Sequence, residues 1–103
     1  MITVTEKAKR YLHTVNADVR LREGSVFRLD RTMSGPYGEG LIVVSVDEPR
    51  EGDQPVEYEG EDILHISGSV SGAHDGCFLD LEEMPEGAAF ILVGLPKAES
   101  RLR

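Results

Sequence analysis

The sequence predicts an α+β fold that is rich in strands, with one N-terminal helix against twisted, mostly antiparallel strands in a sandwich-like or barrel-like arrangement. Two observations predict it. Helical periodicity occurs once, in residues 5–16, whereas short apolar or alternating segments recur roughly every ten residues from position 25 onward. This spacing favours a β-rich α+β domain over a parallel α/β fold, in which helices separate the strands.

The N-terminal segment is expected to form a short strand that leads into the helix. Residues 3–5 favour the strand, and Thr5 is also a suitable N-cap, with Glu6 in the positively polarised first turn. The apolar positions follow the spacing of one helix face: Ala8, Tyr11, Leu12 and Val15. Asn16 is expected to end the helix, because asparagine tolerates left-handed backbone geometry.

The strands are expected in the remaining three quarters of the chain. A half-buried strand is predicted where Phe27, Leu29 and Arg31 alternate with Arg28, Asp30 and Thr32. Residues 41–46 are apolar on both faces and predict a central strand. Two short strands are expected at 56–58 and 62–66. Another begins at Cys77, which shares a strand face with Leu79 and is therefore expected to point towards the core. A buried strand follows at 88–95.

The segments between these strands contain chain breakers or acidic residues. Residues 34–40 are expected to form a loop, and residues 47–54 an exposed acidic turn. Residues 67–76 are rich in glycine and serine and are expected to be flexible.

Length and charge restrict the function. A chain of 103 residues is expected to form one domain, residues 1–103. The net charge of −8 argues against nucleic acid as a partner, because phosphate binding requires clustered lysine and arginine. No segment has the roughly 18 apolar residues of a membrane span, and the first residues lack a signal-peptide pattern. We therefore expect a cytoplasmic protein that binds neither nucleic acid nor membrane.

The order of these segments resembles the HesB/IscA-type family, the A-type iron–sulfur carriers, over nearly the whole chain. The similar segments are Ile2–Ala8, Phe27–Leu29, Met33–Gly35, Leu41–Val46, Asp47–Asp53, Asp75–Gly76, Leu79–Asp80 and Gly87–Pro96. The resemblance implies a HesB-like fold and a role connected with iron–sulfur cluster assembly. It also implies homodimers or higher oligomers.

The chain departs from that family at the ligand cysteines. The family's first ligand lies in a Cys-Ser-Gly segment, which here is Met33-Ser34-Gly35. Its second and third ligands form a Cys-Gly-Cys after an Asn-Pro, whereas this chain has Leu95-Pro96 and no cysteine beyond it. The single cysteine, Cys77, aligns with a strand residue that is not a ligand. The resemblance therefore implies a degenerate member without a metal site or cofactor.

Other residues with chemical potential have ordinary structural explanations. A lone thioether at Met33 is a weak ligand for iron, and packing or a loop-facing position explains it better. His74, Asp75 and Cys77 are too loosely spaced to indicate a metal site, and no third group supports a Cys–His nucleophile. The glycines of residues 35–40 precede a strand rather than a helix, so they do not indicate a phosphate loop. We expect no catalytic residues and no enzyme activity.

The leading hypothesis is an iron–sulfur assembly-related protein that binds no cluster and acts through protein contacts. Its partners would be assembly factors or apo-proteins, and its candidate interaction loop comprises Met33, Ser34, Gly35 and Tyr37. Two alternatives remain open. One is a small-molecule or soft-metal binding module that uses the Met33–Gly40 loop, and the other is a structural domain that associates with itself.

Overall fold

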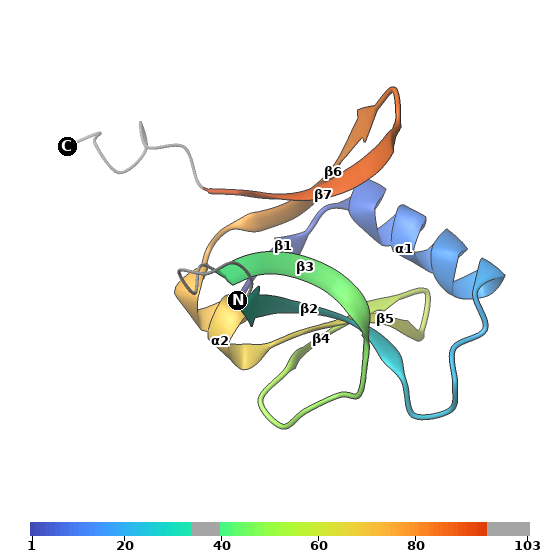
Figure 1. Cartoon of the computed structure of the whole chain (residues 1–103), viewed down its shortest axis with the longest axis horizontal. Coiled ribbons are helices and arrows are strands. Elements are labelled where there is room, and N and C mark those ends of the chain that lie inside the picture. Colours follow the sequence, from blue (N-terminus) through green and yellow to red (C-terminus); the bar gives the residue numbers. More distant parts are fainter. Residues whose placement is uncertain (34–39, 95–103) are drawn as a thin grey trace.

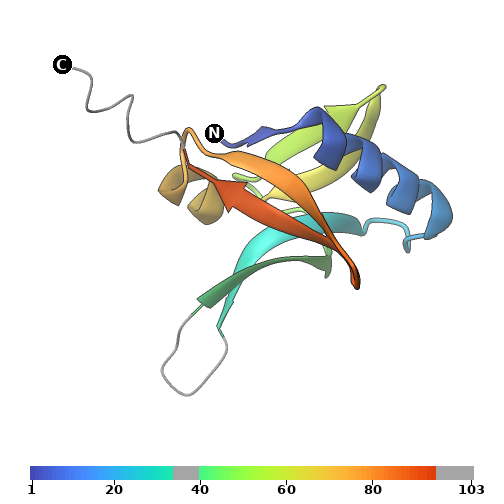
Figure 2. The ribbon, with the colours of Figure 1, turned by 90° about the horizontal axis from the view of Figure 1, so that it is seen from above.

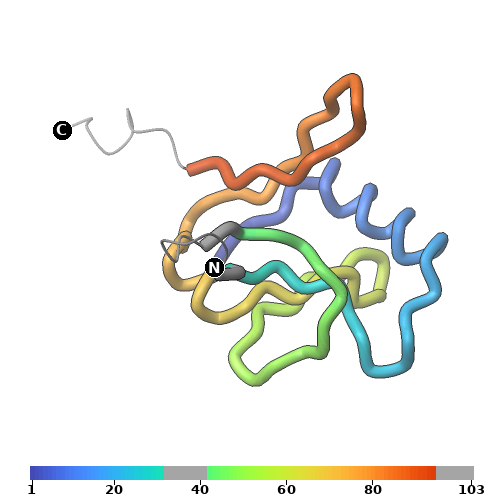
Figure 3. Tube along the Cα trace, in the orientation of Figure 1, coloured from blue at the N-terminus to red at the C-terminus, as the bar shows by residue number. Residues whose placement is uncertain are grey.

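The computed structural model describes residues 1–33 and 40–94, which form seven strands and two helices. In chain order these elements are β1 (Thr3–Val4), α1 (Glu6–Asp18), β2 (Val26–Met33), β3 (Gly40–Asp47), β4 (Gln54–Tyr58), β5 (Glu61–Ile66), α2 (Gly68–Ala73), β6 (Phe78–Met84) and β7 (Gly87–Val93). Figure 1 shows the β6–β7 hairpin above the four-stranded sheet with α1 beside it, and Figure 3 traces the same path as a tube. The predicted strand-rich α+β class is confirmed.

The described strands form two sheets, with the orders β1-β6-β7 and β3-β2-β5-β4. The hairpin pairs β2–β3, β4–β5 and β6–β7 are antiparallel, whereas β1 pairs with β6 and β2 pairs with β5 in parallel. Figure 2 shows that the β2–β3 and β6–β7 hairpins run at an angle to one another. The mostly antiparallel arrangement expected from the strand spacing is therefore present.

Helix α1 begins where the sequence predicted but ends later. The Thr5 hydroxyl oxygen accepts a hydrogen bond from the Ala8 N–H at 3.3 Å, as an N-cap does. The predicted end at Asn16 is wrong, because the helix continues to Asp18. The Asn16 side-chain amide instead donates to the carbonyl of Ile63 at 3.2 Å, so it joins the helix to β5.

The core lies where α1 meets the two sheets. Its buried apolar side chains are Ile2, Val4, Ala8, Leu12, Leu29, Val56, Ile63, Leu64, Ile66, Val70, Leu79 and Leu81. Complete burial of a leucine or isoleucine side chain contributes roughly 1.5–3 kcal/mol to folding. Ala8 is fully buried, and its small side chain lets the helix approach the strands closely.

Two strand predictions need correction. Strand β3 is an edge strand rather than a central one, because among the described strands it pairs only with β2. Val43 and Val46, on opposite faces of the strand, are 38% and 53% exposed. Strand β7 is likewise an edge strand and only partly buried. Apolar residues on both faces therefore did not indicate burial on both faces here.

The segment predicted to be flexible contains a short helix instead. The Ser67 hydroxyl accepts a hydrogen bond from the Val70 N–H at 3.2 Å and caps α2, and Val70 is fully buried. One cap and one anchored apolar side chain thus order a segment whose glycine content suggested mobility.

Candidate functional site

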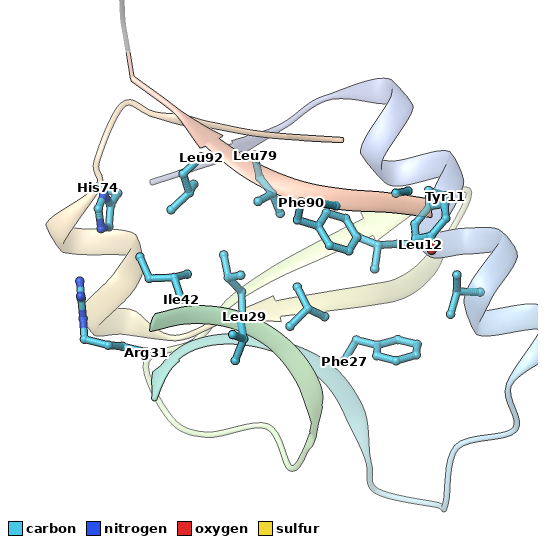
Figure 4. A pocket seen from close by; sticks show the side chains of 15 residues that line it. Tyr11, Leu12, Phe27, Leu29, Arg31, Ile42, His74, Leu79, Phe90 and Leu92 are labelled. Carbon is cyan, nitrogen blue, oxygen red and sulfur yellow. The ribbon is translucent and has the colours of Figure 1, made fainter. Parts of the chain in front are cut away.

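A groove of about 710 Å³ lies between the β2–β3 hairpin and the β6–β7 hairpin. Its apolar lining includes Leu12, Leu29, Val44, Leu79, Phe90 and Leu92. Figure 4 shows Leu79 and Leu92 on one side, facing Leu29 on the other. Small-molecule sites usually have volumes of about 300–1,000 Å³ and mainly apolar walls, so this groove has the size and lining of such a site.

Strand alternation places these side chains in the groove. In the antiparallel pair β2–β3, Leu29 lies opposite Val44 and Arg31 lies opposite Ile42. Because alternate residues of a strand share one face, Phe27, Leu29 and Arg31 project together. The sequence predicted this alternation correctly, although it gave no indication of a groove.

The two ends of the groove differ in polarity. At one end the rings of Tyr11 and Phe90 meet edge to face, with their centroids 5.7 Å apart. At the other end Figure 4 shows Arg31 and His74, the two residues of the lining that can carry positive charge. The groove is therefore amphipathic along its length.

His74 owes its position to the end of α2. It is the C-cap residue of that helix, and its backbone N–H donates to the carbonyl of Val70 at 3.0 Å. Its Nε2 atom is buried and has no hydrogen-bond partner among the described residues. A buried nitrogen without a partner costs free energy, which a bound hydrogen-bonding group would recover.

A separate ionic cluster lies on the opposite face of β2. Arg28, 4% exposed, donates to both carboxylate oxygens of Asp53, at 2.9 Å and 2.8 Å, and also to Asp30. The hydrogen bonds from Arg28 hold the pKa of Asp53 below its usual value, and the same bonds raise the pKa of Arg28. The pair attaches the β3–β4 connection to β2, so it is a structural element.

The residues around this cluster correct two predictions. Asp53, expected in an exposed turn, has a side chain only 3% exposed. Gln54, expected in the same turn, begins β4. The His65 side chain beside them is 14% exposed, with Nδ1 3.8 Å from Asp53 and Nε2 3.5 Å from Asp62.

The structure describes only some of the residues singled out from the sequence. Met33 ends β2 opposite Gly40, while Ser34, Gly35 and Tyr37 lie outside the described residues, so the interaction loop stays a prediction. Cys77 is partly buried just before β6, and its backbone N–H donates to the carbonyl of His74. Sequence reasoning missed the shared position of Arg31 and His74. The only signal was that Arg31 falls on the same strand face as the apolar residues Phe27 and Leu29.

The described residues do not fit an iron–sulfur cluster. Within 1–33 and 40–94, no three His, Cys, Asp or Glu side chains come together in a way that could hold a metal ion. Protein-held clusters usually take four thiolates, whereas the full sequence contains one cysteine. In the same ranges, no helix is long and apolar enough to cross a membrane.

The helix and the two sheets have the fold of the HesB/IscA-type proteins, as the sequence resemblance implied. The structure is similar to Escherichia coli SufA, a protein involved in biosynthesis of iron–sulfur clusters, with a TM-score of 0.63 and 20% identity over 88% of this chain and 77% of SufA. It is also similar to IscA with the [2Fe-2S] cluster, with a TM-score of 0.58 and 20% identity over 91% of this chain and 82% of IscA.

A third similar structure is a protein from Aquifex aeolicus solved by solution NMR, with a TM-score of 0.60 and 22% identity over 91% of each chain. No protein-family model matches the sequence, and no curated protein matches it significantly. The likeness at this identity establishes the fold.

Proposed function

We propose that this protein takes part in iron–sulfur cluster assembly without holding a cluster, and that it acts through contacts with other proteins. The observation that carries the proposal is a fold shared with SufA and IscA in a chain whose one cysteine cannot supply a cluster's ligands. We propose further that residues 1–103 form one domain that works in the cytoplasm and is not an enzyme.

The surface offers features that suit protein contacts. Phe78 and Val93 form a cross-strand pair in the β6–β7 hairpin and are 37% and 43% exposed. Exposed apolar pairs of this kind are common in surfaces that bind other proteins. The predicted interaction loop, which comprises Met33, Ser34, Gly35 and Tyr37, is a second candidate for such contacts. The proposed partners are iron–sulfur assembly factors or apo-proteins that receive a cluster.

Reconstitution with iron and sulfide under anaerobic conditions tests the absence of a cluster. We expect the protein to stay colourless after desalting, whereas SufA treated in parallel serves as the positive control. Cys77→Ser should behave identically to the parent. A stable brown product with visible charge-transfer absorption, lost in Cys77→Ser, would show that the lone thiol anchors a cluster and would contradict the proposal.

Affinity capture from the native extract tests the protein contacts. Recovery of iron–sulfur assembly factors or apo iron–sulfur proteins, reduced in Met33→Ala and Tyr37→Ala, would support the proposal and assign the contact to the loop. Arg50→Gln, an exposed change elsewhere, is the matched control. Reproducible recovery of proteins unconnected with iron–sulfur assembly would contradict the proposed role.

We also propose that the protein associates with itself, because the family that its sequence resembles forms oligomers. Light scattering at several protein concentrations measures it directly. Of the alternatives from the sequence, small-molecule binding gains support from the groove rather than from the Met33–Gly40 loop.

A further inference from the structure

The groove contains three structural features that together define a ligand chemistry. Its floor is apolar and fully buried at Leu12, Leu29 and Leu79, and its walls are half-buried at Phe90 and Leu92. An apolar chain that covers the half-buried walls removes their remaining apolar surface from water, which releases free energy. Partly exposed apolar residues in one continuous lining commonly mark a binding groove.

The polar end supplies unused hydrogen-bond donors. Arg31 is exposed and forms no ion pair with the described carboxylates, so its guanidinium is open to a ligand. His74 brings its buried Nε2 to the same end, where it lacks a partner in the described part of the chain. An imidazole donates from Nε2 whenever that nitrogen carries hydrogen, and a guanidinium suits a carboxylate well.

We propose that this groove binds a single-chain amphipathic carboxylate. The apolar chain would lie along Leu29, Leu79 and Phe90, and the carboxylate would accept hydrogen bonds from Arg31 and His74. This activity goes beyond the proposed role in iron–sulfur assembly and does not depend on it.

The net charge of the protein lets an experiment distinguish specific binding of a carboxylate from non-specific binding of an amphiphile. At −8, the protein attracts cations and repels anions at long range. Non-specific binding of an amphiphile would therefore favour a cationic headgroup. A preference for a carboxylate can come only from local donors, and Arg31 and His74 are the donors in the groove lining that can carry positive charge.

Calorimetric titration with three ligands of equal chain length measures that preference, with the ionic probes below their micelle concentrations and the alcohol below its solubility limit. The probes are dodecanoate, dodecanol and dodecyltrimethylammonium. We expect dodecanoate to bind about ten-fold or more tightly than the cationic amphiphile, with dodecanol between them. Dodecanoate should also shift the methyl NMR signals of Leu29, Leu79 and Leu92, which line the groove.

Two arginine variants separate the local from the general effect of charge. Arg31→Gln should weaken dodecanoate binding by about ten-fold and leave dodecanol unchanged. Arg50→Gln removes the same charge from an exposed arginine outside the groove and should change dodecanoate affinity by less than about two-fold. Because Arg31 is exposed, its variant should keep the parental fold, which circular dichroism verifies.

Three results would overturn the proposal. The first is no measurable dodecanoate binding, and the second is equal or tighter binding of the cationic amphiphile. The third is an equal effect of the two arginine variants. A dimer that Val44→Asn dissociates, combined with absent dodecanoate binding, would show that a second copy covers the groove instead. None of these outcomes bears on cluster reconstitution, so the two proposals fail separately.

Discussion

Replacing Asp53 by asparagine should destabilise the protein far more than a change in the exposed turn that the sequence predicts there. The change keeps the side chain's size but removes the charge opposite Arg28, whose two hydrogen bonds to Asp53 measure 2.8 Å and 2.9 Å. Both side chains are nearly enclosed, 5% and 3% exposed. Removing one partner of a buried ion pair costs roughly 3–5 kcal/mol when the remaining charge has no other partner, whereas Arg28 would keep its hydrogen bond to Asp30.

Asparagine can still accept one hydrogen bond, so we expect a loss of about 3 kcal/mol, at the lower end of that range. Urea unfolding followed by circular dichroism measures it. With an m-value near 1.5 kcal/mol per molar, the midpoint should fall by about 2 M. Glu57→Gln, an exposed change on β4, should alter stability by less than about 0.5 kcal/mol. An Asp53→Asn variant as stable as Glu57→Gln would refute the reasoning.

The same pair predicts a pH dependence with a definite sign. Hydrogen bonds from Arg28, the main cause, lower the pKa of Asp53 in the folded state, whereas the unfolded value is about 3.9. The stabilisation is therefore complete above the unfolded pKa and is lost as the pH falls through the folded pKa. The stability difference between the parent and Asp53→Asn should be constant from about pH 5 to 7 and shrink below about pH 4.

Three further changes test how the sheets and α2 are held. The Gln54 side chain accepts hydrogen bonds from the Ile2 N–H and the Ser71 hydroxyl, and it donates to the Ile2 carbonyl. Gln54→Ala should therefore lower the free energy of unfolding by about 3 kcal/mol, which thermal unfolding measures. Gly68→Ala should destabilise by roughly 1–3 kcal/mol, because its new methyl would lie 2.9 Å from a backbone oxygen of Gly52. Gly72 lies in the same helix, but a methyl group there would meet open space. Gly72→Ala should therefore stabilise the protein by roughly 0.5–1 kcal/mol. Equal effects of the two glycine changes would contradict the close packing of Gly68 against Gly52.

Local patterns predicted the fold class and most element positions because they depend on neighbouring residues. The N-cap at Thr5 and the alternation of Phe27, Leu29 and Arg31 needed only short-range rules. The family resemblance supplied the arrangement of the sheets, and the structural similarity to SufA and IscA confirms it at the level of fold.

The errors arose where a distant residue decides the structure. Asparagine is common at helix ends, but the side-chain amide of Asn16 donates a hydrogen bond to the carbonyl of Ile63, 47 residues away, and the helix continues. Asp53 lies among turn residues, yet its partner Arg28 is 25 residues earlier. The groove likewise combines an alternating strand with His74, which follows a helix that composition did not predict. Sequence patterns within one segment cannot identify such long-range partners.

The buried core lies apart from the positions at which the sequence resemblance places the family's cysteines. The buried apolar side chains of the described residues lie between Ile2 and Leu12, at Leu29 and between Val56 and Leu81. The positions that replace the family's cysteines lie at the end of β2 and beyond β7, outside these segments. The described packing, the Arg28–Asp53 pair and the Gln54 hydrogen bonds therefore involve none of those positions.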